Sequence, residues 1–319
     1  MIYFAPIEGI GGYIYRNALQ KYFGGADKYF SPFLAPTQDF SFNSKEKKDV
    51  LPEHNETIHL VPQILTNKAD QFLWAAAEME KRGYEEVNLN LGCPSGTVVT
   101  KGKGAGFLGH LEELNRFLEE IFSKVNVQVS VKTRLGVEAA EEFEPLLEIF
   151  NRYPICELIV HPRVQKQHYR KTPDREAFRR ALKNSKVPTG FNGDLFTAEA
   201  YKAAVLEFPE ASSMMLGRGV LGNPGLLREI RTGQRMTKEE LQAFLDEVYQ
   251  RYREVLPGSK PVYFKMKELW FYMGDTFTDS ERYLKKIRKA RNLEEYEAAA
   301  NALFREQELI PGAGFFGTP

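Results

Sequence analysis

The regular alternation of apolar, strand-length runs with amphipathic stretches constrains the fold of this chain more than any other feature. Eight such runs occur before Gly233, and most have the apolar character of strands that pair in parallel and are covered on both faces. Helical patterns separate them, except that residues 39–55 are polar and look only partly helical. Eight is the number of strands that closes a (β/α)8 barrel, so we predict an α/β fold with a TIM barrel over residues 1–233. The predicted strands are Ile2–Ala5, Lys28–Phe33, Ile58–Leu65, Val87–Leu91, Gln128–Arg134, Leu158–His161, Thr189–Phe191 and Ser212–Leu216.

Strand signals stop after about Gly233, and the rest of the chain has helical patterning. Thr237 followed by Glu240 has the spacing of a capping box, which marks the start of a helix. We therefore predict a small helical domain of roughly four helices over residues 234–310, followed by a flexible, glycine-rich tail over residues 311–319. The helices are predicted to break at Pro257-Gly258, around Gly274-Asp275 and near Asn292.

Composition excludes several classes of protein. The 319 residues contain no apolar run of the ~18 residues that a membrane span needs. The first residues, Met1–Pro6, lack a basic segment and favour a first strand over a signal peptide. Only two cysteines, Cys93 and Cys156, are present, which excludes a disulfide framework and fits a reducing compartment. We expect a cytoplasmic monomer with no membrane association and no metal site.

Charge is balanced in number but not in distribution. The 43 basic and 43 acidic residues cancel, so the net charge gives no support for a nucleic-acid partner. Basic residues nevertheless crowd two short stretches, and a neutral protein can present a basic face to a polyanion. Most charge runs are only solvated helix faces, so this indication is weak on its own. The two stretches are Arg163, Lys166, His168, Arg170, Lys171 and Arg175, and Arg282, Lys285, Lys286, Arg288, Lys289 and Arg291.

Cys93 lies at the end of an alternating strand, within Gly92-Cys93-Pro94, and a glycine-rich loop follows it. Pro94 favours an extended backbone at Cys93, so the thiol is presented at the strand end. The glycines of the loop permit unusual backbone conformations, and we expect a mobile flap beside the thiol. In isolation a free cysteine is more often a small buried hydrophobe. The other strand ends favour a reactive role here.

Nearly every predicted strand end carries a polar or reactive side chain, and active sites of barrels lie at these ends. Lys132 is the hardest to explain by packing, because a buried lysine is rare without a partner. Each residue alone has a structural explanation, such as a loop cap or a core histidine, but their succession favours a single site. In strand order they are Gln63, Asn90, Cys93, Lys132, His161, Arg163, Asn192, Gly193, Asp194, Gly217 and Arg218.

The last two strand ends predict a phosphate site. Gly193, Gly217 and Gly219 would allow a phosphate to approach backbone N–H groups closely, and Arg218 would add positive charge. Asn223-Pro224 begins the helix that follows. Barrels often bind phosphate with these two loops, so a phosphorylated cofactor is the expected occupant.

Together these motifs resemble those of the tRNA-dihydrouridine synthase family. The combination covers the whole chain, including the helical region, and is highly specific although each motif alone is not. Two positions depart from the usual pattern, since Ile7 stands where the family commonly has methionine and Pro162 where it commonly has glycine. Neither departure removes a reacting group. The matching motifs are Ala5-Pro6, residues 88–94, 104–108 and 131–136, His161-Pro162-Arg163 with Tyr169 downstream, and residues 192–194 and 217–224.

The resemblance implies an FMN-dependent oxidoreductase that reduces the C5–C6 double bond of specific uridines in tRNA, with NADPH as the reductant. It implies that Cys93 is the general acid, a role that suits a thiol protonated at neutral pH, and that Lys132 stabilises the anionic reduced flavin. The target nucleotide would have to leave its stack to reach the barrel mouth. The residues implied to bind the cofactor are Ala5, Pro6, Gln63, Lys132, His161, Asn192, Gly193, Asp194, Gly217 and Arg218. Those implied to bind RNA are Asn90, Arg163, Tyr169, Lys265 and Lys267, together with the basic segment 282–291.

Two other hypotheses compete with this one. An FMN-dependent barrel acting on a free pyrimidine, similar to dihydroorotate dehydrogenase, would use comparable chemistry but gives no reason for the basic helical region. An inactive barrel that only binds RNA would not need Cys93, Lys132 or the phosphate loops.

Overall fold

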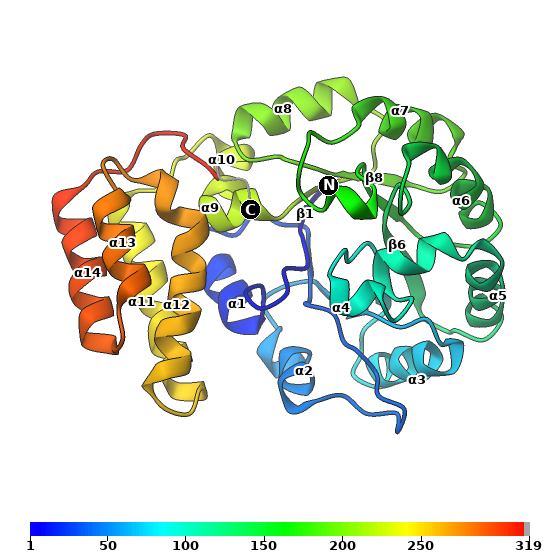
Figure 1. The fold of residues 1–319 in the computed structure, drawn as a ribbon, viewed down its shortest axis with the longest axis horizontal. Helices are drawn as coiled ribbons and strands as arrows, with labels where there is room; N and C mark the ends of the chain where they lie inside the picture. Colours follow the sequence, from blue (N-terminus) through cyan, green and yellow to red (C-terminus); the bar gives the residue numbers. More distant parts are fainter. Residues whose placement is uncertain (316–319) are drawn as a thin grey trace.

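A computed structural model describes residues 1–315, and it places a ring of helices around a parallel sheet with a helical bundle at one side (Figure 1). The strand order is β3-β2-β1-β9-β8-β7-β6-β5-β4, and every pairing between these strands is parallel. The predicted α/β barrel is therefore confirmed. The strands are β1 (Ile2–Phe4), β2 (Lys28–Phe30), β3 (Leu60–Val61), β4 (Gln63–Ile64), β5 (Glu86–Leu91), β6 (Gln128–Arg134), β7 (Leu158–His161), β8 (Thr189–Asn192) and β9 (Met214–Leu216).

The barrel has nine short strands where eight were predicted, because the run Ile58–Leu65 is divided at Pro62. Proline has no backbone N–H and cannot donate to a strand ladder. β3, before the proline, pairs with β2, and β4, after it, pairs with β5. The carbonyl of Pro62 still accepts a hydrogen bond from the Asn88 N–H at 2.9 Å. The two halves therefore join both edges of the sheet and close the ring.

Two hydrophobic layers hold the barrel together. The interior is filled by a small cluster of buried side chains from alternate positions on the strands: Tyr3, Ala5, Phe30, Val61, Ile159 and Met215. The intervening positions, such as Phe4 and Tyr29, point outward and join the much larger layer between strands and helices. This two-sided burial explains the nearly continuous apolar character of the strands.

The helices around the barrel lie in the amphipathic stretches that separate the strand-length runs. The polar segment after β2 contains only one short helix, α2, whose N-cap Asn43 forms a capping box with Glu46. The helices of the barrel region are α1 (Tyr13–Tyr22), α2 (Ser44–Asp49), α3 (Ala69–Glu80), α4 (Gly96–Val99), α5 (Leu111–Phe122), α6 (Phe143–Phe150), α7 (Arg175–Asn184), α8 (Ala198–Glu207), α9 (Arg218–Gly222) and α10 (Leu226–Thr232). Short 3-10 turns are η1 (Pro52–His54), η2 (Gly104–Gly109), η3 (Ala140–Glu142), η4 (Gln165–Gln167) and η5 (Gly274–Thr276).

Four helices form the bundle beside the barrel, and they break where the sequence predicts. Gly233, with φ of 78°, ends α10, and the domain boundary that we propose at 233/234 falls in the linker that follows. The bundle packs on α1 through Phe244, whose ring meets Tyr15 edge-on at 5.5 Å and Phe23 at 5.6 Å. The helices are α11 (Lys238–Val255), α12 (Ser259–Met273), α13 (Glu281–Lys289) and α14 (Leu293–Glu306). No helix within residues 1–315 is both long and apolar enough to cross a membrane.

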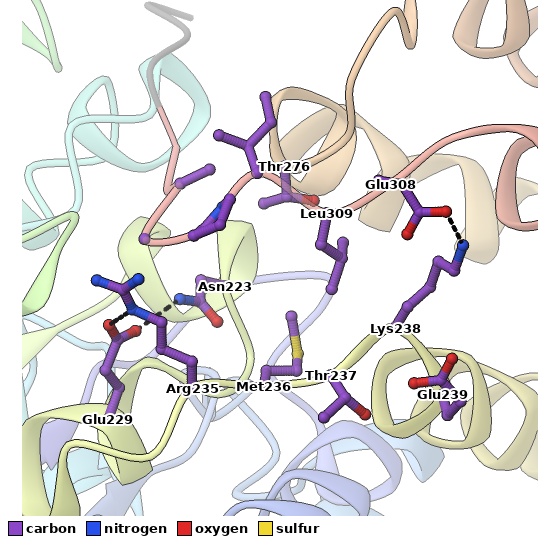
Figure 2. Close-up of a pocket in the computed structure, with 14 residues that line it drawn as sticks. Asn223, Glu229, Arg235, Met236, Thr237, Lys238, Glu239, Thr276, Glu308 and Leu309 are labelled. Carbon is purple, nitrogen blue, oxygen red and sulfur yellow. Dashed lines mark hydrogen bonds and ion pairs between the residues drawn. The ribbon is translucent and has the colours of Figure 1, made fainter.

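The expected flexible tail needs correction for residues 311–315; residues 316–319 lie outside the described part. The chain returns from α14 toward the barrel, and residues 311–313 line a cavity opposite Arg235, Met236 and Thr237 (Figure 2). Phe315 is 1% exposed because its ring packs into the barrel end of the bundle. The glycine-rich composition of this segment predicted flexibility and gave no sign that Phe315 would be buried. The cavity in Figure 2 is bordered by the ion pairs Lys238–Glu308 and Arg235–Glu229, and Glu239 also lines it.

Candidate active site

A pocket opens at the carboxyl ends of the strands, where a barrel places its chemistry. Most of the predicted cofactor-binding residues line it, together with Tyr169. Gln63, Asn90, Cys93, Arg163, Lys265 and Lys267 do not line it. Among residues 1–315 no group of three or more His, Cys, Asp or Glu side chains could hold a metal ion. The lining residues are Ala5, Pro6, Ile7, Lys132, His161, Tyr169, Asn192, Gly193, Asp194, Leu195, Phe196, Met215, Gly217, Arg218 and Gly219.

Lys132 projects its ammonium into this pocket from the middle of the barrel rim. The side chain is partly buried on β6, and no described group hydrogen-bonds to its Nζ. Burial, reinforced by the neighbouring Arg134 guanidinium, lowers the pKa of Lys132 to about 7. A cation held here without a partner is suited to a ligand that brings negative charge.

His161 is a neutral member of the same pocket. Burial lowers the pKa of its imidazole well below the ordinary value, and four cations around it act in the same direction. The Nη1 of Arg163 lies 2.8 Å from Nε2, and a guanidinium can only donate, so Nε2 is the acceptor. The ring therefore carries its proton on Nδ1, where it can donate to a ligand. The four cations are Arg134, Lys132, Arg163 and Arg218.

Arg218 is held in place by one carboxylate and several aromatic rings. Its Nη2 donates to Oδ1 of Asp194 at 2.7 Å. Its guanidinium carbon lies 4.5 Å from the ring centroid of Tyr169, 5.2 Å from that of Phe196 and 5.6 Å from that of Phe315. Asp194 thus orients the arginine, and because it also lines the pocket its contact with the cofactor stays a prediction.

Arg163 does not face solvent, which corrects the expectation that it meets RNA phosphates. The residue is only 1% exposed. Its guanidinium forms a two-pronged ion pair with Asp194 and also donates to the carbonyl of Lys171 at 2.6 Å. A buried charge must be paired, and Asp194 and these carbonyl groups satisfy it completely. Arg163 does not line the pocket, but its hydrogen bonds hold His161 and Asp194 in place.

The loops after β8 and β9 pack so closely at Gly193, Gly217 and Gly219 that a side chain there would press against neighbouring residues. A Cβ at Gly193 would lie 2.9 Å from the Phe191 ring, and one at Gly217 would lie 3.1 Å from the Ile7 side chain. A Cβ at Gly219 would lie 2.2 Å from the Leu195 carbonyl oxygen, so the two loops touch through their backbones. Gly217 is the N-cap of α9 and lines the pocket together with Arg218 and Gly219.

Cys93 is fixed by a chain of amide side chains. Its backbone N–H donates to Oδ1 of Asn90 at 2.9 Å, and Nδ2 of Asn90 donates to Oε1 of Gln63 at 2.7 Å. Gln63 in turn donates to Oδ1 of Asn88 at 2.8 Å. The amide groups expected to touch flavin and uracil are thus largely engaged with each other. They fix the backbone at Cys93, and the expected contacts of Gln63 with flavin and of Asn90 with uracil stay predictions.

Burial raises the pKa of the Cys93 thiol above its ordinary value, although Arg134 and Lys132 act in the opposite direction. The thiol is therefore protonated at neutral pH. The expected mobile flap is wrong for residues 104–108, which are buried in η2, whereas residues 95–97 of the same loop are exposed. Gly104 has φ of 56°, and a Cβ there would lie 2.8 Å from the Cys93 carbonyl oxygen. Gly104 therefore packs directly against the backbone of Cys93.

Arg134 is a site residue that the strand-end inspection missed. It is 1% exposed, and its Nε donates to the Gly92 carbonyl at 2.9 Å while Nη1 donates to the His168 carbonyl at 2.7 Å. It thus ties the cysteine loop to the loop that carries Tyr169. The signal was present in the sequence, since an arginine as the last residue of a buried strand requires buried acceptors.

Lys265 and Lys267, both predicted to bind RNA, point in different directions from α12. Lys265 donates to the carbonyl of Gly9 at 2.8 Å and pairs with Glu268 at 2.7 Å, on the barrel side. Lys267 donates to the carbonyl of Ala290, just after α13. Two residues two positions apart on a helix do not share a face, so they cannot form one contact patch.

The sequence of this chain matches the model of one protein family. The family model described as Dihydrouridine synthase (Dus) matches residues 3–310. Relatives include tRNA-dihydrouridine synthase B of Pasteurella multocida, 28% identical over 71% of this chain and 68% of the relative. The tRNA-dihydrouridine(16) synthase of Neisseria meningitidis serogroup A is 25% identical over 96% of this chain and 95% of the relative.

Solved structures share the fold at lower similarity. The old yellow enzyme homologue from Zymomonas mobilis superimposes with a TM-score of 0.55 at 13% identity, covering 76% of this chain and 91% of that one. At this identity the likeness supports the barrel alone. From the family match, which covers nearly all of the described residues, the chain belongs to the dihydrouridine synthase family.

Proposed function

We propose that this member of the dihydrouridine synthase family reduces the C5–C6 double bond of specific uridines in tRNA, using FMN that is reduced by NADPH. The observation that carries the proposal is the unpartnered Lys132 ammonium in a pocket that adjoins a protonated, rigidly held Cys93. The family match gives no support to the alternative of a free pyrimidine as substrate.

The residues of the pocket fit FMN. The loops after β8 and β9, with Gly193 and Gly217, would hold the phosphate, with Arg218 beside it. The neutral His161 can donate from Nδ1, and Lys132 can stabilise negative charge on the ring. When bound, FMN would carry two electrons from NADPH to C6 of the uracil as a hydride.

Cys93 completes the reduction by acid catalysis. Carbon 5 of the uracil must gain a proton as C6 gains the hydride, and the thiol can give that proton because burial keeps it protonated. The resulting thiolate would be stabilised by the nearby cations Lys132 and Arg134 until it regains a proton from solvent. Asn90 holds the cysteine backbone in the required place.

The chain offers a matched control for this assignment. Cys156 lies just before β7, at the other end of the barrel, and burial raises the pKa of its thiol to about 12. The test is to purify the protein, record flavin absorption, and measure NADPH-dependent dihydrouridine formation in an unmodified tRNA transcript. We expect turnover by the parent and by Cys156→Ala, and a loss on the order of 10²–10⁴-fold in Cys93→Ala.

Bleaching of the flavin by NADPH should be unchanged in Cys93→Ala, because the thiol serves only the uracil half of the reaction. A colourless protein, or a parent that reduces orotate-type compounds and not tRNA, would overturn the proposed function. Parental turnover by Cys93→Ala would overturn only the role of the cysteine.

A further inference from the structure

A second cavity lies at the junction between the barrel and the helical bundle. Its walls come from the loop after β1 and from α1 and α2 of the barrel, and from α11 and α12 of the bundle. Both barrel helices lie on the side of the barrel that faces the bundle (Figure 1). The cavity shares no lining residue with the candidate active site. It is therefore a separate site, and its occupant need not take part in the reaction.

The size and the walls of this cavity suit a small organic molecule. Its volume is about 340 Å³, whereas about 150 Å³ is enough to bind benzene. Tyr13, Ile14 and Leu256 are among the side chains that make most of its wall apolar. The ring of Tyr13 is held by stacking on His54, with the two ring centroids 4.2 Å apart. Largely apolar cavities with a few polar groups are typical of ligand sites.

One polar group of the cavity lacks a partner. Tyr252, near the end of α11, is only 8% exposed and lines the cavity from the bundle side. Its hydroxyl forms no hydrogen bond with any group of residues 1–315. A hydroxyl buried in this way costs free energy unless an acceptor satisfies it. A ligand with an acceptor oxygen would supply that hydrogen bond.

The charge that remains free in the cavity is positive. Lys48, which lines it from α2, forms no ion pair within residues 1–315. A ligand with a single negative group would complement this ammonium, whereas a polyanion would bring several charges to one free cation. The other charged lining side chains are already paired: Asp49 with Arg16 at 3.0 Å, Lys265 with Glu268 at 2.7 Å and Lys45 with Glu8 at 3.5 Å.

We infer that this cavity binds a small carboxylic acid with an apolar body, either aromatic or alkyl. The body would fill the space between α1, α2 and α11, Lys48 would pair with the carboxylate from the barrel side, and Tyr252 would donate a hydrogen bond from the bundle side. The inference goes beyond the proposed function, because it depends neither on flavin nor on RNA.

The experiment is calorimetric titration of the purified full chain with 2-naphthoate, octanoate and 2-naphthalenemethanol. We expect saturable binding of at least one of the two acids at one site per chain, and the tighter acid identifies the aromatic or the alkyl class. The alcohol has the naphthalene body without the charge, and it should bind about two- to fivefold more weakly than 2-naphthoate, as expected for loss of one exposed ion pair. Absence of binding by both acids would overturn the inference.

Substitutions then place the bound acid in the cavity. Tyr252→Phe keeps the ring and should weaken binding by about tenfold, the effect of losing one hydrogen bond to a charged group. Lys48→Gln should weaken it by about two- to fivefold, and Lys48→Arg should restore it. Val255→Trp should abolish binding by filling the cavity, since Val255 lines it. Lys47→Gln is the matched control, because Lys47 is exposed on the same helix and does not line the cavity.

Two results would contradict this assignment. Parental affinity in both Tyr252→Phe and Val255→Trp would show that the acid binds elsewhere. Displacement of the bound acid by an unmodified tRNA transcript would assign the cavity to the path of the RNA and overturn a separate ligand site. Because the readout is binding of the acid, a failure to reduce uridine would count only against the proposed function.

Discussion

The charge of Lys132 has no partner in the pocket, and we therefore predict that the free energy of unfolding depends on pH. Burial lowers the pKa of Lys132 from 10.5 to about 7. The unfolded chain keeps this proton up to about pH 10.4, whereas the folded chain releases it from about pH 7 upward. The unfolded state therefore binds more protons between these two values, and the free energy of unfolding rises with pH across this interval.

The magnitude follows from the displacement of the pKa. Each pH unit inside the interval contributes about 1.4 kcal/mol, so the charged lysine destabilises the flavin-free protein by roughly 4 kcal/mol at pH 7 and by almost nothing above pH 10.5. Lys132→Met keeps the length of the side chain and removes the charge. At pH 6.5 the flavin-free Met variant should therefore be more stable than the parent by several kcal/mol, and this gap should narrow as the pH rises.

The assay is urea unfolding of flavin-free parent and variant at pH 6.5, 7.5, 8.5 and 9.5. The difference between the two proteins isolates Lys132, because every other titrating group is common to both. Lys202→Met, which removes an exposed lysine on α8, should show no pH-dependent gap. A Lys132→Met gap that is constant with pH, or a variant less stable than the parent throughout, would refute the electrostatic argument.

Three further substitutions probe the groups around the pocket. Gly104→Ala should destabilise the protein by about 1–3 kcal/mol and slow uridine reduction, because its Cβ would press on the Cys93 carbonyl oxygen at a backbone with φ of 56°; thermal unfolding and turnover measure both effects. Arg163→Ala should cost about 3 kcal/mol in urea unfolding, since it leaves Asp194 with half of its ion pairing; a loss under 1 kcal/mol would contradict the buried-pair assignment. Phe315→Ala should weaken FMN binding several-fold in a fluorescence titration and, because the ring is buried, should also cost about 3–5 kcal/mol in urea unfolding; unchanged FMN affinity would show that the ring does not support the phosphate site.

The fold was largely predictable because its signals are local. Each strand is an apolar run, each surrounding helix is amphipathic, and the breaks in the bundle fall at Pro257-Gly258, Gly274 and Asn292. The division of one strand at Pro62 could also have been predicted, since a proline inside a central strand cannot donate a hydrogen bond to the neighbouring strand. Strand ends then located the pocket, because a barrel brings the ends of distant segments to one rim.

Direction and burial of charged side chains could not be predicted in the same way. Arg163 lies in a basic stretch and looks like a surface residue, but its partner Asp194 is 31 residues away on the next strand end. Phe315 lies in a glycine-rich segment whose composition indicates disorder, and its ring contacts Phe196 after β8, Arg218 in α9 and Tyr272 in α12. Only the tertiary structure reveals such pairs, because each member is locally unremarkable.

The packing of Phe315 against Arg218 also has a consequence for biosynthesis. The two residues are separated by 97 positions, so the ribosome completes the barrel strands and α9 well before Phe315 is made. Domains generally fold as units from the N-terminus during synthesis. The barrel can therefore form on the nascent chain before Phe315 packs against Arg218. Tight retention of the cofactor is then expected only after the bundle has been translated and has docked, which orders cofactor loading after assembly of the helical region.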